Sequence, residues 1–223
     1  MEWFSAAMAA TESSTVPLAY PADRWDQIYD IWIWLVTAIY ILVAVPMIYF
    51  LIKYRYKEGV NEKGAEEHGS FGLEILWTII PLIIVIYLAV QSAAFYTEQR
   101  TPPPDSMVVK TTGMMWTWQF DYPNGKTTYS ELVVPVGKPI KLELTSNDVL
   151  HAFHIPAAKT MEDAVPGRVT RMWFQFNETG EFRSFCREYC GTAHAYMLAT
   201  IKVVEQDEFD AWLNPGSAAV GAE

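Results

Sequence analysis

Residues 31–52 read IWIWLVTAIYILVAVPMIYFLI, a run of 22 residues without a single charged side chain. At about 1.5 Å per residue, a helix of this length crosses the roughly 30 Å hydrocarbon core of a bilayer. Residues 75–96, ILWTIIPLIIVIYLAVQSAAFY, form a second uncharged run of the same length. Pro46 and Pro81 fall inside the runs, and membrane helices tolerate proline because neighbouring helices satisfy the freed carbonyls. The two runs therefore predict a transmembrane hairpin rather than two buried helices of a soluble core.

The flanks of these runs predict the orientation of the hairpin. Basic side chains gather in the connecting loop, residues 53–74: Lys53, Arg55, Lys57 and Lys63. Arg24 is the only Lys or Arg in the N-terminal segment, residues 1–30. This segment has no basic region followed by a short apolar stretch, so no signal peptide is expected in it. Because short loops rich in Lys and Arg stay on the cytoplasmic side, we expect both ends of the chain to face outward.

Composition limits the classes of function. The chain is 51% hydrophobic and its formal net charge is -10. The apolar content argues against a disordered chain, and the acidic balance argues against a nucleic-acid partner, which would need a basic face.

Beyond the second run the pattern changes to that of a β domain. Residues 97–106 include the sequence TPPPD, which predicts a stiff linker. Short apolar or alternating runs follow, separated by turn signals, over residues 107–111, 115–120, 132–134, 140–145, 172–176 and 198–204. They predict a small all-β sandwich or barrel over residues 107–205 on the outer surface, followed by a C-terminal tail, residues 206–223, that begins with a short polar helix.

One segment of this domain carries candidate metal ligands. Residues 185–197 read FCREYCGTAHAYM, in which Cys190, His194 and Met197 supply a thiolate, an imidazole and a thioether. Soft ligands of this kind select copper. The spacing therefore favours a copper site over simple core packing of Met197.

A second histidine and a second cysteine extend the set. His151 and His154 lie three residues apart on a predicted strand, so they point to opposite faces and only one can serve. Cys186 precedes Cys190 by four residues. A mononuclear blue-copper site needs one thiolate, so two cysteines favour two copper ions bridged by both sulfurs. The alternatives are a disulfide between the cysteines, and a structural zinc with two Cys and two His ligands, which would leave Met197 without a role.

The order of the motifs resembles subunit II of haem–copper cytochrome c oxidases. The pattern Cys186-x3-Cys190-Gly191-x2-His194-x2-Met197 follows the sequence DVLH at residues 148–151. Further matching motifs are LEILWTIIP at 73–81, WTWQF at 116–120 and EDAVPGR at 162–168. The resemblance runs from the first apolar run to about Val204.

This resemblance implies a two-helix transmembrane hairpin followed by an all-β cupredoxin-type Greek-key barrel that carries a dinuclear copper centre. The implied copper ligands are His151, Cys186, Cys190, His194 and Met197, with the backbone carbonyl of Glu188 as the sixth. The choice of His151 over His154 follows from the DVLH match.

The resemblance also implies a function and several partners. It implies a subunit that accepts single electrons from a c-type cytochrome and passes them to haem in the catalytic subunit I, where dioxygen is reduced to water. Trp116 is the implied point at which electrons enter, and Glu74 is the implied mouth of a proton pathway. The Glu188 side chain is implied to bind magnesium or manganese at the contact with the catalytic subunit.

We expect a multi-pass protein of a respiratory membrane, bacterial plasma membrane rather than mitochondrial inner membrane, with its β domain on the periplasmic side. The alternatives are a membrane-tethered copper carrier and a metal-free quinol-oxidase subunit II. The second class lacks the copper ligands, all five of which are present as side chains here. A nitrous-oxide reductase domain shares the copper pattern but lacks the two-helix anchor.

Overall fold

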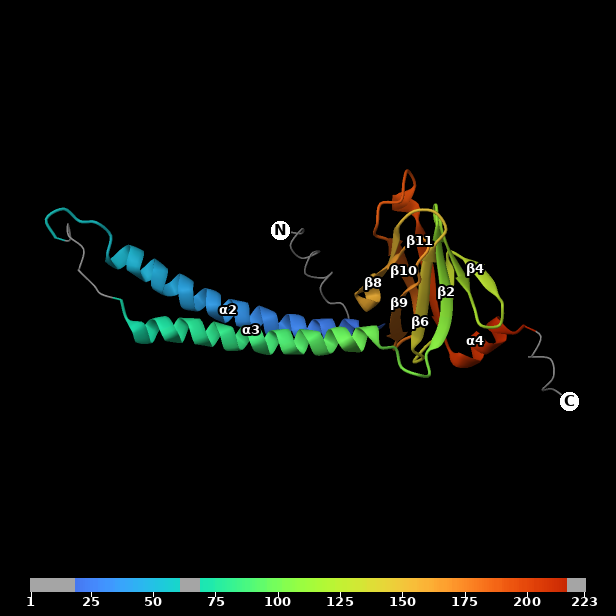
Figure 1. Ribbon diagram of the computed structural model, residues 1–223, viewed down its shortest axis with the longest axis horizontal. Helices are drawn as coiled ribbons and strands as arrows, with labels where there is room; N and C mark the ends of the chain where they lie inside the picture. The colour runs from blue at the N-terminus through green and yellow to red at the C-terminus, as the bar shows by residue number, and fades with distance from the viewer. Residues whose placement is uncertain (1–18, 61–68, 216–223) are drawn as a thin grey trace, which may run out of the picture. The chain divides into compact units, whose positions relative to one another are not determined.

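The computed structural model describes residues 19–60 and 69–215 (Figure 1). The expectations for residues 1–18, for Lys63 and for the end of the tail lie outside these described residues. The chain divides into two compact units. Among the described residues, one unit lies within residues 26–95, and the other joins residues 19–25 to residues 96–215.

The first unit is a pair of long helices, α2 (Ala22–Lys53) and α3 (Phe71–Arg100), drawn side by side in Figure 1. Both are long and apolar enough to cross a membrane, and almost none of their most apolar residues is buried in the structure. A surface this apolar is costly in water and stable in lipid. The helices also satisfy their own backbone groups, apart from those freed at Pro46 and Pro81, as a lipid-facing segment must.

Both helices extend past the uncharged runs. The first begins nine residues before Ile31, and the second continues through residues 97–100, which the sequence analysis assigned to the linker. Glu98, Gln99 and Arg100 are good helix formers, so the helix persists once the apolar stretch has ended. It stops before Pro102, because the residue before a proline disfavours the helical conformation.

The second unit is built from two β-sheets (Figure 1). One sheet has the order β1 (Ala19–Tyr20), β9 (Thr170–Phe176), β6 (Ile140–Ser146), β2 (Met107–Met114), β3 (Thr117–Asp121) and β4 (Thr127–Tyr129). The other has the order β5 (Glu131–Pro135), β11 (Leu198–Val204), β10 (Gly180–Cys186), β7 (His151–Ile155) and β8 (Thr160–Ala164). A short helix, α4 (Gln206–Leu213), follows β11.

Alternation along the strands builds the core of this unit. In β6, Ile140, Leu142 and Leu144 are fully buried while the residues between them are partly exposed. Large aromatic side chains fill the space between the sheets, and Trp118 packs edge-on against Phe153. The fold class predicted from the sequence, two apolar helices followed by a β-sheet domain, is confirmed.

Two local features differ from the sequence expectations. The expected strand over residues 115–120 begins only at Thr117, because Met115 and Trp116 form a turn. Trp116 is therefore 40% exposed, whereas Trp118 is fully buried. The second feature is β1, in which Ala19 pairs with Phe176 of β9 and the Tyr20 ring stacks on Trp173 at 4.2 Å between centroids.

Candidate metal centre

The chain segment between β10 and β11 is held at both ends. Phe185 of β10 pairs with Leu198 of β11, and the amide of Cys186 donates to the carbonyl of Met197 at 3.1 Å. A single turn of 3-10 helix over His194–Tyr196 lies between these ends. A segment closed by strand pairing holds its side chains in place more firmly than a free loop does.

The neighbouring strand β7 brings His151 to this segment. Phe153 pairs with Cys186 across β7 and β10, and side chains two residues apart share a face of a strand. His151 therefore lies on the core face beside Cys186, whereas His154 lies on the outer face. His151 Nδ1 is 3.8 Å from Cys186 Sγ.

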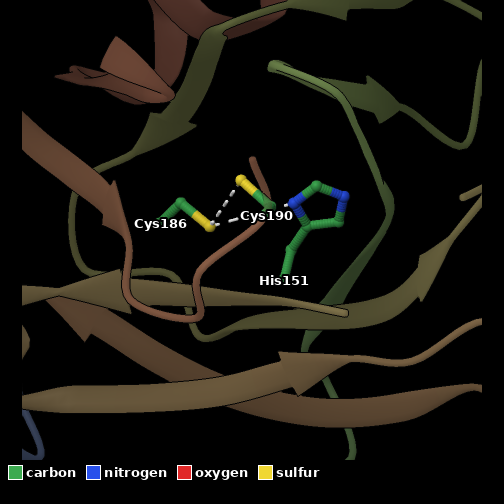
Figure 2. Close-up of side chains that lie close together, drawn as sticks. All are labelled: His151, Cys186 and Cys190. Atoms are coloured by element: carbon green, nitrogen blue, oxygen red, sulfur yellow. Dashed lines mark hydrogen bonds between the residues drawn. The ribbon is translucent and has the colours of Figure 1, made fainter. Parts of the chain in front are cut away.

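Soft donor atoms converge at this point. Figure 2 shows the side chains of His151, Cys186 and Cys190 directed toward one another, and one ligand atom from each lies within 4.8 Å of the others. Cys190 Sγ is 3.8 Å from Cys186 Sγ, 3.5 Å from His194 Nδ1 and 3.6 Å from Met197 Sδ. The carbonyl oxygen of Glu188 lies 3.2 Å from Cys186 Sγ.

Burial and bonding state distinguish the possible roles of these sulfurs. Cys186 and Cys190 are free and buried, at a separation far above the roughly 2.0 Å of a disulfide. Burial and the neighbouring Cys186 thiol raise the pKa of Cys190 to about 11. A metal that binds this sulfur must therefore displace its proton. Three sulfurs and two imidazoles suit a soft transition metal, and copper fits the thioether better than zinc does.

A hydrogen-bond network orients His151. Its Nε2–H donates to Asp148 Oδ1 at 2.7 Å, which leaves the Nδ1 lone pair directed at the sulfurs. Asp148 also accepts from the amides of Met115 and Val149, both at 2.6 Å. Although burial opposes it, these hydrogen bonds lower the pKa of Asp148 to about 2. A carboxylate behind a histidine ligand is a common arrangement in metal sites.

Close packing constrains the same ring from another side. A Cβ atom on Gly113 of β2 would lie 2.9 Å from His151 Cδ2 and 3.1 Å from Trp118 Cζ3. Residue 113 must therefore be glycine for the ring to sit where it does. The sequence analysis assigned a role to neither Asp148 nor Gly113; the position of Asp148 three residues before His151 was the signal available.

The remaining predicted residues lie at different distances from the cluster. Trp116 contacts it directly, because its Nε1–H donates to the carbonyl of Cys190 at 3.2 Å. The side chain of Glu188 is exposed on the same segment. Glu74 belongs to the other unit, in the first turn of α3, where it is exposed and its carbonyl accepts from Thr78 Oγ1 at 2.8 Å.

These features define a class: a β-sandwich anchored by two apolar helices, with a buried soft-donor centre. Family models agree with each part. Residues 12–95 match the transmembrane domain of cytochrome c oxidase subunit II, and residues 126–204 match its periplasmic domain. The chain belongs to the cytochrome c oxidase subunit II family, and it is a membrane protein.

Individual relatives agree. Cytochrome c oxidase subunit 2 of Alkalihalophilus pseudofirmus is 38% identical over 210 residues, covering 90% of this chain and 61% of the relative. The Cereibacter sphaeroides protein of the same name is 29% identical over 218 residues, covering 80% of this chain and 71% of the relative. The crystal structure of the periplasmic domain of subunit II of cytochrome oxidase from Bradyrhizobium japonicum superposes with a TM-score of 0.50 at 37% identity, covering 53% of this chain and 98% of that one. The family implies copper, and the β domain has the cupredoxin-like fold of this neighbour.

Proposed function

We propose that the chain is the electron-accepting subunit of a cytochrome c oxidase. It takes electrons one at a time from a c-type cytochrome and passes them to haem in the catalytic subunit, where dioxygen is reduced to water. The observation that carries this proposal is the convergence of five soft side-chain donors in a family member whose relatives are named as oxidase subunits.

The proposed copper ligands are the side chains of His151, Cys186, Cys190, His194 and Met197 and the carbonyl of Glu188. Two copper ions held by these residues would supply a one-electron redox centre. The protein holds His151 and Cys186 on the paired strands β7 and β10 and the other three donors in the segment between β10 and β11, and it keeps four of the five side chains buried from water.

Trp116 is the proposed point where the electron enters. Its ring is 40% exposed, so a docked cytochrome can contact it, and its indole N–H donates to the carbonyl of Cys190. One side chain thus links the surface to the backbone of a proposed copper ligand.

Two acidic residues have proposed roles outside the copper centre. The Glu188 carboxylate, exposed between the two cysteines, is proposed to bind magnesium or manganese at the contact with the catalytic subunit, since hard ions prefer oxygen ligands. Glu74, exposed at the start of α3, is proposed to open a proton pathway that continues into the catalytic subunit.

The proposed location is a bacterial respiratory membrane with the β domain on the periplasmic side. The pairing of β1 with β9 supports an even number of crossings, because strands that precede and follow both helices belong to one sheet. The basic side chains Lys53, at the end of α2, and Arg55 and Lys57, just beyond it, support a cytoplasmic connection between the helices.

Copper analysis of the purified chain in detergent tests the proposal. We expect the native chain to bind two copper ions with a mixed-valence spectrum, and Cys186→Ser to lose both that spectrum and at least one ion. Glu188→Gln is the matched control, since the backbone carbonyl of Glu188 faces Cys186. It should keep both copper ions in the purified chain, and it should weaken manganese binding in the assembled complex. One copper per native chain, or an intact spectrum in Cys186→Ser, would refute the dinuclear centre. If the native chain bound two copper ions but the assembled complex did not oxidise cytochrome c, the membrane-tethered copper carrier would be favoured.

A further inference from the structure

The proposed copper ligands differ in how far solvent reaches them. His151 and Met197 are fully buried, Cys186 and Cys190 are 6% and 3% exposed, and His194 is only half-buried. An ion that arrives from solvent therefore meets His194 before the other side-chain ligands.

A pocket of about 270 Å³ opens beside His194. Cys186 and Met197 contribute to its wall, and so does His154, the histidine on the outer face of β7. One open cavity thus connects the proposed ligands with an imidazole that is not part of the cluster.

His154 has a thioether neighbour. It pairs with Met161 across the antiparallel strands β7 and β8. Residues directly opposite one another share a face of the sheet, with Cβ atoms about 4.5–5.5 Å apart. Phe185 of β10 lies opposite His154 on the same face of the sheet, and the next residue, Cys186, faces the core. His154 and Met161 therefore lie on the outer face, where Met161 is 51% exposed.

The chemistry of this pair suits copper(I). A thioether is a soft ligand, and a neutral imidazole is a good partner for it. Burial and the nearby Arg187 guanidinium lower the pKa of His154, which favours the neutral ring that can donate a lone pair.

We propose that His154 and Met161 form a loading site, at which copper(I) docks on the outer face before it passes through the pocket to His194 and the cysteines. This inference rests on the proposed copper centre. No electron moves in the transfer: the imidazole and thioether exchange with the next ligands, and each cysteine thiol that takes up the ion releases its proton to water.

Copper uptake by the full chain tests the proposal without any measurement of oxidase activity. The reduced chain, in detergent and without oxygen, is mixed with copper(I) held by bicinchoninate, and the loss of the coloured chelate is followed in time. We expect His154→Gln and Met161→Leu each to slow uptake about tenfold, the low end of what losing an auxiliary residue at a metal site costs. The double variant should be no slower than either single variant, because each change already removes the site. Final copper content, and the spectrum after oxidation, should match those of the native chain.

Met115→Leu is the matched control, because Met115 is a comparably exposed thioether, 46% exposed, close to Gly191 of the metal segment. It should load at the native rate. Native uptake rates in both test variants, or equal slowing in Met115→Leu, would overturn the loading site while leaving the copper centre intact. An altered final copper content or spectrum in His154→Gln would also overturn it, because His154 would then be a permanent ligand. If the native chain itself took up no copper, the proposed centre would fail, and the loading site with it.

Discussion

Trp116 shows how one residue can link surface and centre. Replacing it with Phe keeps an aromatic ring but removes the N–H that donates to the Cys190 carbonyl. We expect Trp116→Phe to slow reduction of the copper centre by cytochrome c by roughly tenfold or more, equivalent to about 1.4 kcal/mol of activation free energy. Stopped-flow absorbance measures this rate, and binding of the cytochrome should change little.

Trp212→Phe provides the comparison for this substitution. Trp212 lies on α4, where it packs against Tyr122 and Lys126, neither of which belongs to the metal segment. It should leave the rate of copper reduction unchanged. If the two variants behaved alike, Trp116 would be an ordinary surface aromatic.

At the scale of elements, the approach of β2 to β7 fixes the position of a proposed ligand. Gly113→Ala would place a methyl group 2.9 Å from His151 Cδ2, and the buried ring cannot move away without leaving Asp148. We expect a loss of about 1–3 kcal/mol in the free energy of unfolding, typical of overpacking. Copper affinity, measured by chelator competition, should fall as well.

The control for this prediction is Gly72→Ala, at a position with nothing within 4 Å of the added methyl group. That variant should keep native copper affinity. Native affinity in Gly113→Ala too would show that His151 has more freedom than its contacts indicate, or that it does not bind the metal.

The first turn of α3 carries a second prediction at this scale. Glu74→Gln removes an exchangeable charge while keeping the shape of the side chain. We expect steady-state oxygen consumption by the assembled oxidase to fall, with copper content and the rate of copper reduction by cytochrome c unchanged. Glu98→Gln, near the other end of α3, should have no such effect, since its exposed ion pair with Arg24 contributes little. Unchanged turnover in Glu74→Gln would make this carboxylate a simple helix-end acid, favoured there by the helix dipole.

At the scale of the whole molecule, charge predicts how a donor approaches. From Thr97 onward the chain has 16 acidic and 11 basic residues, a net charge of -5. An acidic surface attracts a basic cytochrome c over long range, and salt weakens that attraction. We expect the second-order rate of cytochrome c oxidation to fall by tenfold or more as ionic strength rises well above about 0.1 M. An uncharged reductant should show no such dependence, and a salt-independent rate with cytochrome c would refute steering.

The sequence predicted those parts of the fold that have a local signal. Uncharged runs predicted both helices, and alternation predicted strands such as β6 and β11 nearly to the residue. It did not predict β1, which is two residues long and exists only because a distant strand pairs with it. Nor did it predict β8, because its sequence, TMEDA, lacks an apolar pattern.

The candidate site shows the same division. The donor types and their spacing within residues 185–197 are local, so they could be read directly. The choice between His151 and His154 depended on a family resemblance, because strand geometry only shows that they face apart. The contact of Gly113 with the His151 ring arises from packing between strands of different sheets, for which a single sequence carries no signal.

The short strand β1 also has a consequence for biosynthesis. Its residues leave the ribosome before either membrane helix, yet β9, the strand that pairs with them, is made only after both helices. With the β domain on the proposed periplasmic side, the sheet would gain its edge strand only after that domain has crossed the membrane, and until β9 is made Ala19 and Tyr20 have no backbone partners in it. An unpaired sheet edge invites aggregation and proteolysis. A chain whose synthesis stops before Phe176 would therefore leave Ala19 and Tyr20 without their partner strand, open to proteolysis.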